Sequence, residues 1–146
     1  MIEEVRRLMV GTGERAELAV DIADAIRRAR GYRWVGVYEV GDCEIEALGW
    51  SGEGAPAFLR FPVDRGLGGA VVESGETIVV GDVRSDPRYL TTFGNTRSEM
   101  VVPVRGRDGA VRGLIDVESE KPDAFSAGDR SLLERCAAAL EPLWED

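Results

Sequence analysis

The 146-residue sequence contains no histidine, and this absence limits the chemistry that its side chains can perform. A Ser-His-Asp triad, a Cys-His dyad and a His-ligated metal site are all excluded. Any general acid or base must be a carboxylate, lysine, tyrosine or cysteine. The two cysteines, Cys43 and Cys136, lie far apart and have neither metal-binding nor redox spacing. These residues indicate no metal site and no cofactor, and we assign no catalytic residue.

Carboxylates are the more informative side chains, because three of them fall on a predicted β-hairpin. Glu99 is on its first strand, opposite to the apolar side chains there, and Asp116 and Glu118 share one face of its second strand with Leu114. If these carboxylates bind a ligand, their charge favours a cationic or amino-bearing molecule. The alternative is that they are solvated polar positions on a half-exposed face, as charged residues usually are.

The hairpin itself is predicted from two strand-forming runs, residues 99–105 and 111–118. Asp108-Gly109 between them is a strong turn signal. The face opposite to the carboxylates should be packed by a helix layer, because it is almost entirely apolar. That face consists of Met100, Val102, Val104, Val111, Gly113, Ile115 and Val117.

Hydrophobic periodicity predicts the elements that surround this hairpin. Ser126 followed by Asp129 predicts a capping box at the start of the last helix, and Pro142 should end or kink that helix near its last turn. The order of elements indicates an α+β layered domain spanning 1–146, with the first and last helices packed on the apolar face of an antiparallel sheet. The predicted helices are 2–10, 14–29, 66–73 and 126–144, and the further strands are 33–40, 43–50, 57–63 and 77–80.

Composition excludes several classes of partner. The net charge of −9 disfavours nucleic acid and anionic membrane surfaces, because phosphate binding needs clustered lysine and arginine. No apolar run approaches the length of a membrane span, and the charged N-terminus has no signal-peptide core. We expect a cytoplasmic protein that binds neither nucleic acid nor membrane.

Five segments in order give the chain a resemblance to the GAF domain family. They are RGLGG at 65–69, DVRSDPRY at 82–89, SEMVVPV at 98–104, GLIDVES at 113–119 and AFSAGD at 124–129. The resemblance covers residues from about Glu14 to Leu143. It implies a central six-stranded antiparallel sheet, with a small-molecule cleft on the face away from the N- and C-terminal helices. It also implies a homodimer through these helices.

One branch of this superfamily, the free methionine-R-sulfoxide reductases, is enzymatic and uses cysteine thiolates. The resemblance places its three cysteines at Phe58, Gly68 and Thr92, and none of these is cysteine here. The carboxylates that hold the substrate's amino group in that branch correspond to Glu99, Asp116 and Glu118, which are retained. Without a thiolate the reaction has no first step, so a reductase is the disfavoured alternative.

The predicted binding residues are the three carboxylates together with Trp50, Phe58, Tyr89 and Phe93. These aromatic residues fall at loop borders near the inferred cleft, where they could form its walls. The glycines of RGLGG are interpreted as a tight strand-to-helix turn, since the run matches neither a dinucleotide fingerprint nor a P-loop.

We therefore predict a non-enzymatic sensory or regulatory domain that binds an unknown small molecule. Closure of residues 66–97 over the sheet would be read out at the terminal helices, and the signal would pass to a signalling protein partner. A ligand-free dimerisation module is a further alternative, and it predicts a pocket filled by the protein's own side chains.

Overall fold

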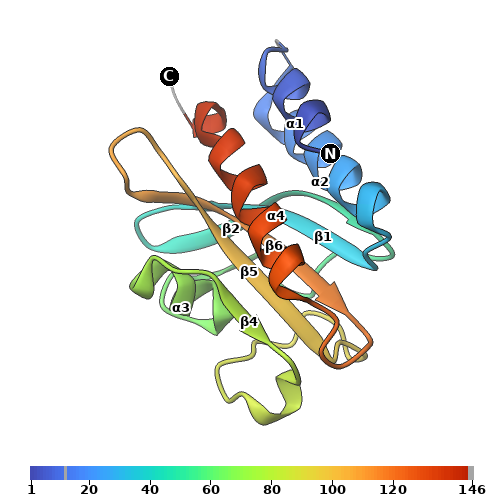
Figure 1. Ribbon diagram of the computed structural model, residues 1–146. Helices are drawn as coiled ribbons and strands as arrows, with labels where there is room; N and C mark the ends of the chain where they lie inside the picture. Colours follow the sequence, from blue (N-terminus) through green and yellow to red (C-terminus); the bar gives the residue numbers. More distant parts are fainter. Residues whose placement is uncertain (12, 145–146) are drawn as a thin grey trace.

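The computed structural model describes residues 1–11 and 13–144, and its elements follow the predicted order (Figure 1). None of the described helices is long and apolar enough to cross a membrane. The helices are α1 (Ile2–Met9), α2 (Arg15–Arg30), α3 (Gly66–Ser74) and α4 (Ala127–Ala139), with 3-10 turns η1 (Val83–Ser85) and η2 (Glu141–Trp144). The strands are β1 (Trp34–Val40), β2 (Glu44–Gly52), β3 (Arg60–Pro62), β4 (Ile78–Val80), β5 (Ser98–Arg105) and β6 (Val111–Ser119).

The six strands form one antiparallel sheet in the order β3-β2-β1-β6-β5-β4. The hairpins β1–β2 and β5–β6 are joined by pairing of β1 with β6, so the two long hairpins form the centre of the sheet. Two short strands, β3 and β4, form its edges. The predicted α+β fold with a six-stranded antiparallel sheet is therefore confirmed.

The terminal helices cover one face of this sheet, as Figure 1 shows with α4 lying across β5 and β6. Apolar side chains of α1, α2 and α4 pack there against the alternate residues Met100, Val102, Ile115 and Val117 of the central hairpin. The contact is close because β2 carries Gly49, where an added Cβ would lie 2.7 Å from the backbone nitrogen of Val20 in α2. The predicted helix layer on the apolar face is confirmed.

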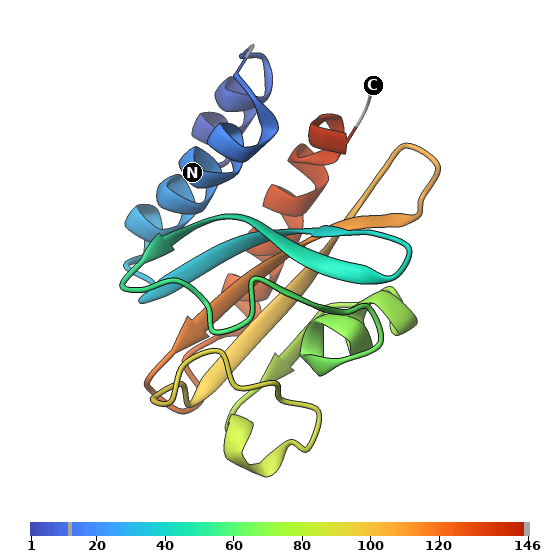
Figure 2. The ribbon, with the colours of Figure 1, turned by 180° about the vertical axis from the view of Figure 1, so that it is seen from behind.

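The opposite face is covered by α3 and by the long connections on either side of it (Figure 2). A second apolar cluster lies there, formed by residues such as Trp34, Tyr38, Val101 and Leu114. Val111 also packs against this cluster, so its prediction as part of the helix-facing set was wrong. The pairing of β5 with β6 shifts register between Val104 and Arg105, and this irregularity breaks the simple alternation that the prediction assumed.

The capping box of α4 also connects α4 to α2. The side chain of Ser126 accepts a hydrogen bond from the Asp129 backbone N–H at 3.1 Å, and Asp129 Oδ2 accepts one from the Ser126 backbone N–H at 2.8 Å. Asp129 Oδ1 accepts further hydrogen bonds from Arg30 at the end of α2 and from Tyr32 just beyond it. Burial would raise the pKa of Asp129, but these hydrogen bonds outweigh it and hold the pKa below the usual range.

Replacing Asp129 with alanine should lower the free energy of unfolding by about 2 kcal/mol, because the cap and the link between helices are lost together. Urea denaturation followed by circular dichroism measures this difference. Asp21→Ala on the exposed side of α2 is the control, with an expected change within about 0.5 kcal/mol. Equal effects of the two substitutions would show that the cap contributes nothing.

Candidate functional site

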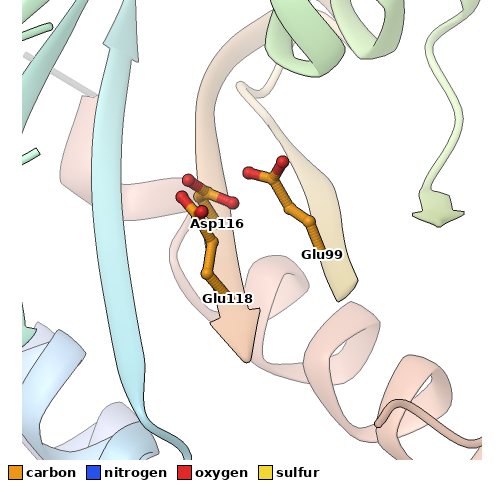
Figure 3. Close-up of side chains that lie close together, drawn as sticks. All are labelled: Glu99, Asp116 and Glu118. Carbon is orange, nitrogen blue, oxygen red and sulfur yellow. The ribbon is translucent and has the colours of Figure 1, made fainter. Parts of the chain in front are cut away.

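Glu99, Asp116 and Glu118 lie together on the sheet face away from the terminal helices. Glu99 on β5 pairs directly with Glu118 on β6, and Asp116 precedes Glu118 by two residues, so the three side chains share one face. One carboxylate oxygen of each lies within 4.8 Å of the others, and Figure 3 shows Glu99 extending from β5 toward the two carboxylates of β6.

All three carboxylates are buried, with exposed fractions of 5%, 6% and 1% in sequence order. The alternative that they are solvated positions on a half-exposed face is therefore wrong. Alternation along the strands gives the face on which they lie, but their burial comes from α3 and the connections that cover that face. Charged residues are almost never buried to this extent without a partner.

Few partners are present for these carboxylates among the described residues. Glu118 Oε1 accepts hydrogen bonds from Thr96 Oγ1 at 2.9 Å and from the Tyr89 hydroxyl at 3.4 Å. Asp116 Oδ1 and Glu118 Oε2 are buried and have no hydrogen-bond partner in the part of the chain that the structure describes. No salt bridge found between the described residues reaches any of the three.

Burial and mutual repulsion raise the pKa of each carboxyl group. For Glu118 the pKa rises from 4.5 to about 9, first because burial penalises the charged form and then because Asp116 is negative. Burial also raises the pKa of Glu99 and Asp116 well above their ordinary values, with the charges of Glu118 and Glu99 respectively adding to the effect. The cluster is therefore costly to charge fully, and a positive group placed within it would be strongly favoured.

A small cavity of about 30 Å³ lies beside the cluster. Glu99 and Asp116 form its polar wall, and Tyr38, Phe61 and Leu114 are among the residues of its apolar wall. A cavity of this size holds about two water molecules, since one needs roughly 10–15 Å³. The cavity is therefore narrow, because the side chains around it leave room only for a few water-sized molecules.

The four predicted wall residues take different places around this cavity. Phe58 lines it directly and is 44% exposed. Tyr89 contacts the cluster through Glu118, and Phe93 packs edge-on against Trp34 with ring centroids 5.2 Å apart. Trp50 packs against the same apolar cluster but does not line the cavity.

Sequence reasoning missed Tyr38, Phe61 and Thr96. The sequence does carry a signal for Tyr38, because strand alternation places it on the same face as Trp34, and both belong to the apolar cluster on the cavity side. The β1–β6 pairing that brings it to Leu114, and with it to the acidic cluster, is a long-range contact that no local pattern reveals. No sequence signal indicates that the hydroxyl of Thr96 contacts Glu118.

Two connecting segments, residues 53–59 and 86–97, meet over the cavity. The backbone N–H of Ala57 donates to the carbonyl oxygen of Thr92 at 3.3 Å. The indole of Trp34 donates to the Gly54 carbonyl oxygen at 3.0 Å and also contacts Phe93, so one side chain holds both segments. These contacts hold the two segments together beside the cavity.

The three positions at which the family resemblance places the reductase cysteines all line this same cavity. Phe58, Gly68 and Thr92 each line it, together with two of the three carboxylates. The preceding Gly66 has φ +72° and begins α3, which agrees with the predicted tight turn. The two cysteines that the chain does have are elsewhere, with Cys43 exposed on the β1–β2 turn and Cys136 buried on α4.

Comparison with known proteins agrees with this geometry. The GAF domain family model matches residues 14–141. Among curated proteins, GAF domain-containing protein A of Dictyostelium discoideum is 26% identical over 97% of this chain and 88% of its own length. Free methionine-R-sulfoxide reductase of Saccharomyces cerevisiae is 31% identical over 84% of this chain, but only 63% of the yeast protein is covered.

Among solved structures, the free methionine-R-sulfoxide reductase of Neisseria meningitidis in complex with its substrate superposes with a TM-score of 0.89. It is 28% identical, and the match covers 98% of this chain and 85% of that one. Fold, motif order and family match all agree, and the chain belongs to the GAF domain family.

Proposed function

We propose that this chain is a sensory or regulatory GAF domain that binds a small, positively charged or amino-bearing ligand beside Glu99, Asp116 and Glu118. The observation that carries the proposal is the burial of three carboxylates within 4.8 Å of one another, without a cationic partner among the described residues. Such a cluster costs stability in the absence of a counter-charge, so its presence favours a binding role over a purely structural one.

The two central strands offer a route from ligand to helices. Glu99 and Asp116 face the cavity, whereas their direct neighbours Met100, Ile115 and Val117 pack against the terminal helices. A ligand that displaces Glu99 or Asp116 would therefore also shift the side chains beneath α2 and α4. A homodimer through these helices, a signalling partner and a cytoplasmic location remain predictions.

Native mass spectrometry of freshly purified protein tests this function. We expect the wild type to retain a small molecule, or to gain one from a metabolite library that also raises its melting temperature. Asp116→Asn combined with Glu118→Gln should abolish this binding, whereas Glu44→Gln, on the exposed start of β2, should not. Unchanged binding by the double variant would remove the carboxylates from the site.

Two alternatives keep specific support. Relatives with reductase names at 28–31% identity favour a redox enzyme acting on free methionine sulfoxide. The narrow cavity favours a ligand-free dimerisation module, which predicts no thermal shift with any compound. We rank both below the sensory role, because the first lacks thiols at the cavity and the second leaves the buried charge cluster unexplained.

A further inference from the structure

We propose that Glu99, Asp116 and Glu118 together bind one hard divalent metal ion, with Ca²⁺ as the best fit. This inference rests on the proposed function, since it names the class of cation that the acidic site takes. The sequence predicted no metal because histidine is absent, but hard ions such as Ca²⁺ and Mg²⁺ require only oxygen ligands.

The spacing of the carboxylates fits a single ion. Ca²⁺ lies about 2.3–2.6 Å from its oxygen ligands, so ligands on opposite sides of it are roughly 4.6–5.2 Å apart. One oxygen from each carboxylate lies within 4.8 Å of the other two, so small rotations of the side chains would let one ion contact all three (Figure 3). Mg²⁺, with contacts of about 2.0–2.1 Å, would require the site to contract.

Two buried oxygens of the cluster lack a hydrogen-bond partner among the described residues, and a bound ion would supply one. Asp116 Oδ1 and Glu118 Oε2 belong to side chains that are 6% and 1% exposed, and neither has a hydrogen-bond partner among the described residues. Buried polar atoms almost always have a partner, so two such atoms in one cluster need an explanation. A metal ion coordinated by the cluster would satisfy both.

The residues and space around the cluster offer two further features of a metal site, which are room for water ligands and hydrogen bonds that orient a carboxylate. The neighbouring cavity of about 30 Å³ admits about two water molecules, which could fill the remaining coordination positions. It is far smaller than the roughly 300–1,000 Å³ of ordinary small-molecule pockets. Thr96 and Tyr89 donate to the other oxygen of Glu118 and would orient that ligand, as outer-shell groups do in metal sites.

Titration calorimetry of the chelator-treated full chain with CaCl₂, and separately with MgCl₂ and MnCl₂, tests the proposal. We expect one Ca²⁺ per chain, bound more tightly than Mg²⁺. Asp116→Asn and, separately, Glu99→Gln should weaken binding by at least about tenfold, because each removes a charged ligand. Glu44→Gln should leave the affinity unchanged, and circular dichroism confirms that each variant is folded.

The proposal is overturned if the wild type binds none of the three ions saturably, or if both site variants keep wild-type affinity. Methylammonium chloride and free L-methionine serve as organic probes in the same assay. Binding of either probe without any metal binding would overturn the metal site but retain the proposed function. If the protein binds no metal and no compound from the metabolite library, both the metal site and the proposed ligand-binding function are rejected.

Discussion

Glu118→Gln should raise the free energy of unfolding of the chelator-treated protein by roughly 4–5 kcal/mol near pH 8 and by no more than about 1 kcal/mol near pH 5. The reason is the environment of Glu118, which is 1% exposed and close to two other carboxylates. Glutamine keeps the size of the side chain and can still accept the hydrogen bond from Thr96, but it carries no charge.

The sign of this change in unfolding free energy follows from proton binding by Glu118 in the folded and unfolded states. The pKa of Glu118 is about 9 in the folded protein, against 4.5 for an ordinary exposed glutamate such as the unfolded chain presents. Between these values the folded state holds a proton that the unfolded state has lost, so stability is full below about pH 4.5 and falls as the pH rises toward 9. Glutamine does not titrate, so the variant avoids this loss of stability. Its advantage over the wild type in free energy of unfolding therefore grows with pH.

Denaturant melts of wild type and variant across this pH range measure the effect. Glu44→Gln is the matched control, because it removes an exposed carboxylate from the same sheet. If wild type and Glu118→Gln lose stability in parallel with rising pH, Glu118 does not have the raised pKa and the buried cluster is not costly.

Free methionine-R-sulfoxide should not be turned over by this protein in the presence of a thiol reductant. A reductase of this kind needs a thiolate beside the substrate, and Phe58, Gly68 and Thr92, where the resemblance places its cysteines, carry none. Burial raises the pKa of Cys136 to about 11, so its thiol is protonated at neutral pH and also lies on the helix side of the sheet. Cys43 lies on the exposed β1–β2 turn and is not among the residues lining the cavity.

An assay of sulfoxide consumption measures this, with a known reductase as the positive control. We expect a rate indistinguishable from that of reductant alone. Turnover by the wild type that disappears in Cys43→Ser would contradict the prediction and place redox chemistry at that cysteine.

The sequence allowed much of the fold to be predicted, because local patterns carry that information. Alternation along β5 and β6 separated Met100 and Val102 from Glu99, and the structure buries the two sets on opposite faces. The Ser126–Asp129 spacing predicted the capping box. Val111 was misplaced because the register shift beside Arg105 has no sequence signature.

The state of the candidate site was harder to predict. The pattern placed Asp116 and Glu118 on the correct face, but whether they are solvated depends on how α3 and the two covering segments pack. Those contacts, such as Ala57 with Thr92, join residues far apart in sequence and involve backbone groups that any residue could supply. Burial of a charge cluster is therefore a property of the tertiary structure.

The most direct test of a buried, uncompensated acidic cluster is an NMR titration of carboxyl ¹³C resonances in chelator-treated protein, assigned with Glu99→Gln, Asp116→Asn and Glu118→Gln. All three groups should titrate well above the usual range, with Glu118 near pH 9. Titration of all three between about pH 3 and 5, as for surface carboxylates, would contradict the account.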